Sequence, residues 1–101
     1  MRFLVKVSMP VEAGNSAAKN GFKSIPEILK ELKPEAAYFY EENGKRTGLL
    51  VIDLKDPSQI PGVAEPFFLA LNAAVEFHPV MTPEDLKKAA PAIAKAVKKY
   101  T

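Results

Sequence analysis

The sequence predicts an α+β domain in which one layer of helices covers a four-stranded antiparallel sheet. Three observations lead to this class: runs that alternate apolar and polar residues, apolar stripes at helical spacing, and an Asn-Gly dipeptide between two alternating runs. In chain order the expected elements are strand, helix, strand, strand, helix, strand and helix. The local signals for each element agree with this order.

The N-terminal part is expected to begin with a strand at residues 2–9, where apolar and polar residues alternate with a period of two. Residues 14–20 are expected to add a helical turn, which Asn20-Gly21 interrupts. The first helix follows, with Ser24 as its N-cap, Glu27 as the capping-box partner of Ser24, and Pro34 just beyond its end. This part therefore supplies one strand and one helix.

The next segment, residues 36–54, is expected to form a β-hairpin around Asn43-Gly44. A two-residue Asn-Gly turn fixes the register of the strands that flank it. The expected register brings opposite charges together at two positions and places an aromatic ring over a glycine. The expected pairs are Glu42 with Lys45, Glu41 with Arg46, and Phe39 with Gly48.

The C-terminal part is expected to hold a helix at residues 57–72 with a kink near Pro66, and then a strand at residues 73–80. Thr82 is expected to cap a last helix, which Pro91 makes irregular. A split βαβ unit that occurs twice in this way gives a ferredoxin-like βαββαβ sheet, here with a C-terminal helix.

The composition limits the classes of protein to which the chain can belong. With 48% apolar and 26% charged residues, residues 1–101 have the size and character of a single globular domain. A net charge of +2 is too small for a nucleic-acid-binding surface, and the absence of cysteine excludes disulfides and cysteine ligands. No stretch resembles a signal peptide or a membrane span. We therefore expect a soluble, cytoplasmic protein that binds neither nucleic acid nor membrane. Because so small a domain buries its surface poorly, we also expect a homodimer.

Strict alternation along the strands sorts the side chains between the two faces of the sheet. The face toward the helices is expected to be apolar, with Phe3, Val5, Val7, Ala37, Phe39, Leu50, Ile52, Leu54, Val75 and Phe77. The other face has no helix over it and is expected to mix apolar with polar side chains, a mixture typical of an interface or a pocket. Its expected members are Leu4, Lys6, Ser8, Ala36, Tyr38, Tyr40, Thr47, Leu49, Val51, Asp53, Glu76 and His78.

His78, the only histidine, is the candidate catalytic residue on this face. An imidazole exchanges protons near neutral pH, and Glu76 shares its face, so His78 could act as a general base. The alternative is structural, because Pro79 favours an extended backbone at which the ring only satisfies a loop carbonyl. Together with Asp53 these residues include possible metal ligands. Isolated ligands do not make a metal site, however, and we expect neither a metal nor another cofactor.

The candidate ligand-binding residues are Lys6, Tyr38, Tyr40, Asp53 and Glu76. The two tyrosines could stack on an aromatic ligand or lie in a subunit interface, since tyrosine combines an apolar body with a polar tip. Lys6 and Glu76 are expected to form an ion pair across adjacent strands. The lysines of the last helix are expected to form a solvated surface.

This order of elements and the half-apolar sheet face resemble the dimeric α+β barrel superfamily, which includes muconolactone-isomerase-like and antibiotic-biosynthesis-monooxygenase-like proteins. The resemblance extends over almost the whole chain and rests on architecture, since no catalytic motif of the superfamily matches residue by residue. It implies that two sheets pack face to face. It also implies that a small, often aromatic, molecule binds between sheet and helices or within the barrel.

We therefore expect a homodimer that pairs through the open sheet face and binds a small apolar or aromatic molecule. It could be a cofactor-free isomerase or monooxygenase-like enzyme acting on an aromatic or lactone compound, or a non-catalytic dimerisation or interaction domain. Other classes lack their motifs. Leucine and valine stand where an RNA-recognition module has aromatics, and neither C-x-x-C nor a glycine-rich nucleotide-binding loop occurs.

Overall fold

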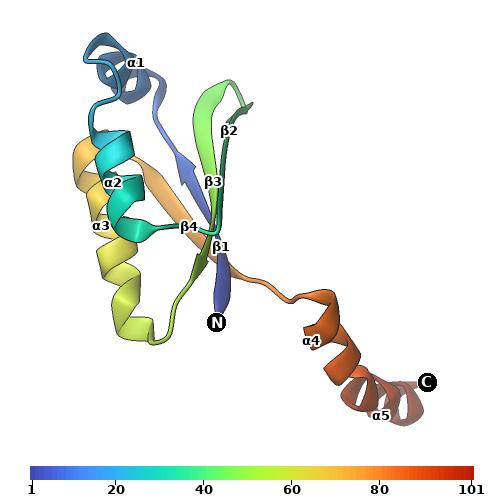
Figure 1. Ribbon diagram of the computed structural model, residues 1–101. Coiled ribbons are helices and arrows are strands. Elements are labelled where there is room, and N and C mark those ends of the chain that lie inside the picture. Colours follow the sequence, from blue (N-terminus) through green and yellow to red (C-terminus); the bar gives the residue numbers. More distant parts are fainter.

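The computed structural model describes residues 1–101 and shows an α+β domain with a four-stranded antiparallel sheet (Figure 1). The strand order β2-β3-β1-β4 is that of a ferredoxin-like fold, so the predicted fold class is confirmed. The strands are β1 (Arg2–Ser8), β2 (Ala36–Glu42), β3 (Lys45–Asp53) and β4 (Ala74–Pro79). The helices are α1 (Val11–Lys19), α2 (Ser24–Leu32), α3 (Ile60–Leu71), α4 (Pro83–Lys88) and α5 (Ala90–Tyr100), and Pro57–Gln59 form a 3₁₀ turn, η1.

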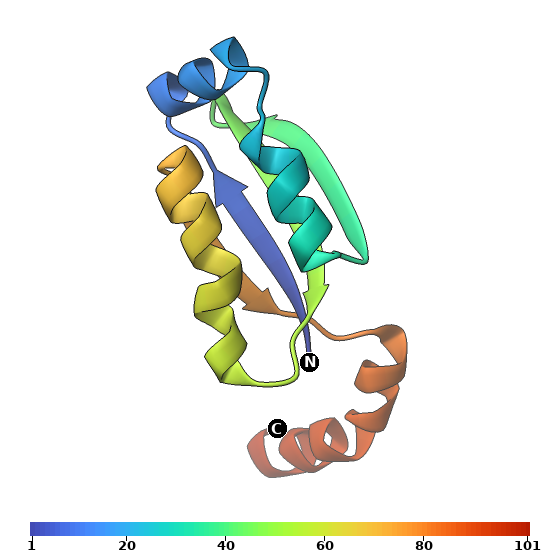
Figure 2. The ribbon, with the colours of Figure 1, turned by 60° about the vertical axis from the view of Figure 1, so that its left-hand side comes forward.

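Helices α1, α2 and α3 lie on one face of the sheet, and the opposite face is open (Figure 1, Figure 2). The core lies between these two layers, because alternate residues of β1 and β3 point toward the helices. Val5 and Leu50 are its most completely buried strand residues, at 0% and 1% exposure. The apolar side chains predicted to face the helices from β1 and β4 all contact this core, namely Phe3, Val5, Val7, Val75 and Phe77.

The β2–β3 hairpin has the predicted register. The three expected pairs, Glu42 with Lys45, Glu41 with Arg46 and Phe39 with Gly48, are observed. A Cβ atom added at Gly48 would lie 3.2 Å from Cε1 of Phe39, so the ring covers the position at which a side chain is missing. Strand β2 is an edge strand, and Phe39 remains 56% exposed although it points to the helix side.

Of two predictions for the segment between β1 and β2, one was right in part and one was wrong. The helical turn expected within residues 14–20 belongs to α1, which begins earlier, directly after Pro10, and ends at Lys19, before Asn20-Gly21. Ser24 is the first residue of α2 and not its N-cap, and no side chain caps this helix. The physical reason lies in the preceding turn: residue 23 already has helical dihedral angles, whereas an N-cap requires an extended backbone.

The C-terminal elements agree better with the predictions. Helix α3 continues through Pro66. The hydroxyl of Thr82 accepts a hydrogen bond from the backbone N–H of Asp85 at 3.2 Å, and the Asp85 carboxylate accepts one from the N–H of Thr82 at 3.0 Å. The last helical segment is divided at Ala89 into α4 and α5, with Pro91 in the first turn of α5.

Helices α4 and α5, which we call the C-terminal arm, project away from the rest of the domain (Figure 1, Figure 2). The arm leaves after β4, on the side of the sheet opposite to α1, α2 and α3 (Figure 1). No residue of either helix is buried. The radius of gyration is consequently 17.2 Å, against about 13 Å for a compact chain of this length.

Candidate functional site

A network of polar side chains crosses the open face of the sheet. Lys6 on β1 lies at its centre, with its Nζ atom 2.7 Å from Oε2 of Glu42 and 3.2 Å from Oε2 of Glu76. The Tyr40 hydroxyl donates a hydrogen bond to Oε1 of Glu42 at 2.9 Å. At the other end, Oε1 of Glu76 lies 3.6 Å from Nε2 of His78. This open-face network therefore runs from Tyr40 on β2 to His78 on β4.

These contacts determine the charges at the centre of the network. The hydrogen bond from Lys6 lowers the pKa of Glu42, and the hydrogen bond from Tyr40 lowers it further. Hydrogen bonds to Glu42 and then to Glu76 raise the pKa of Lys6, and the bond to Glu42 raises the pKa of Tyr40. At neutral pH Lys6 is therefore a cation, Glu42 is an anion and Tyr40 keeps its proton.

The open-face network brings together most of the site residues predicted from the sequence, namely Lys6, Tyr40, Glu76 and His78, and it contains the predicted ion pair between Lys6 and Glu76. Asp53 lies apart, because its carboxylate accepts a hydrogen bond from the N-terminal ammonium group at 3.0 Å, and this contact lowers its pKa. Tyr38 is 67% exposed on β2. Sequence reasoning missed Glu42, although alternation from Tyr38 and Tyr40 places it on the same face.

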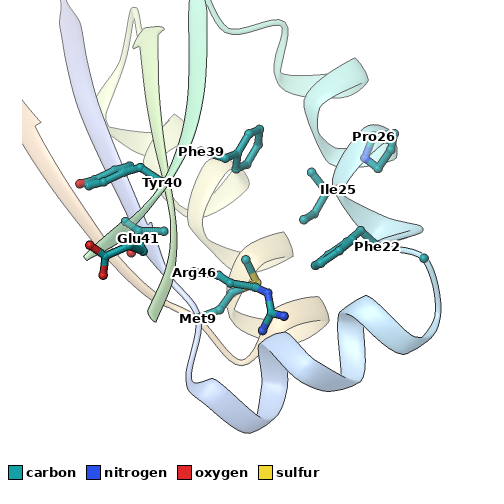
Figure 3. A pocket seen from close by; sticks show the side chains of 10 residues that line it. Met9, Phe22, Ile25, Pro26, Phe39, Tyr40, Glu41 and Arg46 are labelled. Carbon is teal, nitrogen blue, oxygen red and sulfur yellow. The ribbon is translucent and has the colours of Figure 1, made fainter. Parts of the chain in front are cut away.

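A cleft of about 530 Å³ lies on the other side of the sheet, between the start of α2 and the β2–β3 hairpin (Figure 3). Phe39 points from β2 toward Ile25 and Phe22, and Met9 lies at one end beside Arg46 (Figure 3). The lining residues are Met9, Gly21, Phe22, Ile25, Pro26, Phe39, Tyr40, Glu41, Arg46 and Thr47. This volume is within the range of about 300–1,000 Å³ that small-molecule sites occupy.

The cleft exists because the helical layer does not cover the edge strand completely. Phe39 is on the helix side of β2 and still more than half exposed. Sequence reasoning missed this site because alternation gave only the face of Phe39, on the helix side of the sheet, and not how far the helices cover it. The signal that could have revealed it is the outer position of β2 in a ferredoxin-like sheet.

Arg46 places a positive charge at one end of the cleft. Its Nη1 donates a hydrogen bond to Oδ1 of Asn15 at 2.9 Å. Its guanidinium carbon lies 5.9 Å from the ring centroid of Phe22. Its stem passes so close to α1 that a Cβ atom added at Gly14 would lie 3.2 Å from Cδ of Arg46. Three neighbours therefore position this side chain.

Phe22, in the wall of the cleft, has a strained backbone. Its φ is +53°, in the left-handed region that bulky residues rarely adopt. Such a conformation costs about 1–3 kcal/mol and occurs preferentially at functional sites. Here the strained residue presents an aromatic ring to both Ile25 and Arg46 (Figure 3).

Other features and the comparisons add no further assignment. No group of three or more His, Asp or Glu residues is placed to hold a metal ion. None of the helices has both the length and the apolar character that a membrane crossing requires. Neither the protein-family models nor the curated proteins contain a match to this chain. The cleft and the open-face network are therefore the basis for a functional proposal.

Proposed function

We propose that this protein binds a small, mostly apolar molecule in the cleft and acts as a homodimer that pairs through the open face of its sheet. The observation on which the proposal depends is the apolar hollow of about 530 Å³. Interiors of proteins are close-packed, whereas apolar side chains around an open cleft are in contact with water. A bound apolar molecule would cover Phe22, Ile25 and Phe39 together.

A second copy of the chain is the proposed cover for the open face. Leu49 and Val51 lie there partly exposed, beside the exposed ring of Tyr38. The C-terminal arm extends on the same side of the sheet (Figure 1). Helix α5 has 11 residues and buries none of them, and isolated helices of fewer than about 12–15 residues are marginal in water. Contact with a partner would stabilise this helix.

Ligand binding can be tested with a variant that fills the cleft and leaves the open face unchanged. Pro26 is exposed in the cleft lining, so Pro26→Trp should place an indole in the space for the ligand. A thermal-shift screen with aromatic acids, quinones and lactones should find compounds that raise the unfolding midpoint of the wild type, because they bind only the folded state. Pro26→Trp should lose this response.

The matched control is Leu69→Trp, at a position on α3 that is 82% exposed and outside the cleft. This variant should respond to the same compounds as the wild type does. If no compound raises the midpoint, or if Pro26→Trp responds like the control, the cleft is not a ligand site.

A second candidate function is a cofactor-free isomerase at the open-face network. It is favoured by the contact between Glu76 and His78, since a carboxylate beside an imidazole can orient the ring for proton transfer. A γ-lactone incubated with the protein in deuterated water should exchange its α-protons faster than it does alone, as seen by NMR. The acceleration should disappear in His78→Ala, and unchanged exchange in that variant would remove His78 from the mechanism.

A further inference from the structure

We propose that the ligand of the cleft carries a carboxylate and that Arg46 binds it, so that the ligand class is an aromatic or branched aliphatic monocarboxylate. This inference depends on the proposed use of the cleft as the ligand site and names the chemistry of its occupant. It follows from two features of the cleft: its wall is apolar, and the cation at one end of that wall, Arg46, is held in position but has no carboxylate partner.

The guanidinium of Arg46 is held in position by its neighbours. Asn15 holds one nitrogen of Arg46 through a hydrogen bond of 2.9 Å, and Phe22 lies 5.9 Å from the guanidinium carbon. Gly14 leaves room for the guanidinium of Arg46, because a Cβ there would lie 3.0 Å from Nη1. A guanidinium held in this way loses little conformational freedom when it binds an anion.

Arg46 forms no ion pair with a carboxylate of the chain. Glu41 is directly opposite Arg46 in the hairpin register, yet its carboxylate accepts a hydrogen bond from the N–H of Gly44 at 3.1 Å. The ion pairs of the chain join other residues, and none of them includes Arg46. A guanidinium has five N–H donors, and only one hydrogen bond to a side chain is formed. The remaining donors match the two oxygens of a carboxylate.

The shape of the lining decides what the rest of the ligand must be. Phe39, Ile25 and Phe22 face one another across the gap, and Arg46 is at one end (Figure 3). A compact apolar body with one terminal carboxylate satisfies both parts. The apolar stripe of the C-terminal arm is a poorer occupant, because the arm has five lysines and two acidic residues and therefore a net charge of +3, which Arg46 would repel.

The experiment compares two probes that differ only in charge, biphenyl-4-carboxylate and its neutral analogue biphenyl-4-carboxamide. Their affinities for the full chain are measured by calorimetry, and NMR confirms that the signals of Met9 and Ile25 respond. The wild type should prefer the acid. Arg46→Gln should weaken the acid by about tenfold or more and leave the amide unchanged.

A variant that keeps the charge of Arg46 sharpens the test. Gly14→Ala adds a methyl group 3.0 Å from Nη1 of Arg46, so the guanidinium has to shift from its observed position, while alanine favours the helix and the fold is kept. Gly62→Ala is the control, because a Cβ there meets nothing within 4 Å. Acid binding should fall in Gly14→Ala and stay unchanged in Gly62→Ala.

The outcomes separate this inference from the proposed function. Equal affinity for acid and amide would overturn the carboxylate assignment and leave the cleft as a site for neutral molecules. A preference for the acid that survives Arg46→Gln would overturn the assignment of Arg46 as the group that binds the carboxylate. Binding of neither probe, with no response of the cleft signals, would overturn both.

Discussion

The apolar stripe of α5 offers the sharpest test of the homodimer. Ile93 and Val97 are one turn apart on this helix and are 50% and 54% exposed. Covering the exposed half of such a side chain contributes roughly 1 kcal/mol. In a two-fold dimer each residue occurs twice, so covering these four side chains would contribute about 4 kcal/mol to association, which corresponds to about 1,000-fold in Kd.

The double variant Ile93→Asp/Val97→Asp should therefore raise the dimer dissociation constant by about three orders of magnitude. Sedimentation equilibrium measures this constant, and circular dichroism should show that helical content falls at low protein concentration, because α5 alone is short. The control Lys95→Ala/Lys98→Ala changes the net charge by the same amount, on the other side of the helix. It should dimerise like the wild type.

Two results would refute this reasoning. A wild type that sediments as a monomer at micromolar concentration would remove the homodimer altogether. A double variant that dimerises as tightly as the lysine control would leave the dimer in place but exclude the arm from its interface. The second result would leave the sheet face itself as the interface, where Leu49 and Val51 are the apolar candidates.

Three further predictions concern stability. The hydrogen bond from Lys6 lowers the pKa of Glu42 in the folded state. Glu42 therefore stabilises the fold above its unfolded pKa, and this stabilisation is lost as the pH falls through the folded pKa. Lys6→Met should remove this effect, so that the unfolding midpoint falls less steeply as the pH is lowered than it does in the wild type. Leu50→Ala, at a side chain that is 1% exposed, should cost about 2–5 kcal/mol and lower the midpoint by at least about 8 °C in calorimetry, and an unchanged midpoint would place Leu50 outside the core. Lys33 ends α2 with a φ of +49°, so Lys33→Gly should raise the free energy of unfolding in urea by up to about 1 kcal/mol, whereas a loss would show that the lysine side chain itself stabilises this end.

The fold could be predicted from sequence because its determinants are local or periodic. The Asn43-Gly44 turn alone fixes the register of β2 and β3, and every pair derived from it is observed. Alternation then assigns faces without knowledge of the strand order. The N-cap of α2 was mispredicted because the left-handed turn at Gly21 and Phe22 sets the backbone of residue 23, and the Ser-x-x-Glu pattern contains no information about that turn.

The candidate site was harder to predict because it depends on how far one layer covers another. Alternation placed Lys6, Glu76 and His78 on one face, and their contacts follow from the pairing of β1 with β4. The cleft has no such periodic signal. It forms where residues from three distant segments, Met9, Phe22 and Phe39, meet at a sheet edge that the helices leave uncovered.

The two proposed surfaces lie on opposite faces of the same edge strand, since Phe39 and Tyr40 are neighbours that alternate across β2. The side chain of Tyr40 points away from that of Phe39 and joins the open-face network through Glu42, whereas the ring of Phe39 points into the cleft (Figure 3). A partner on the open face and a ligand in the cleft would therefore both restrict β2, which has a paired neighbour on one side only. Dimerisation would remove part of the conformational freedom of β2 that ligand binding otherwise has to remove, and ligand binding would do the same for dimerisation. Because such coupling is reciprocal, ligand binding would tighten the dimer by the same factor by which dimerisation tightens ligand binding.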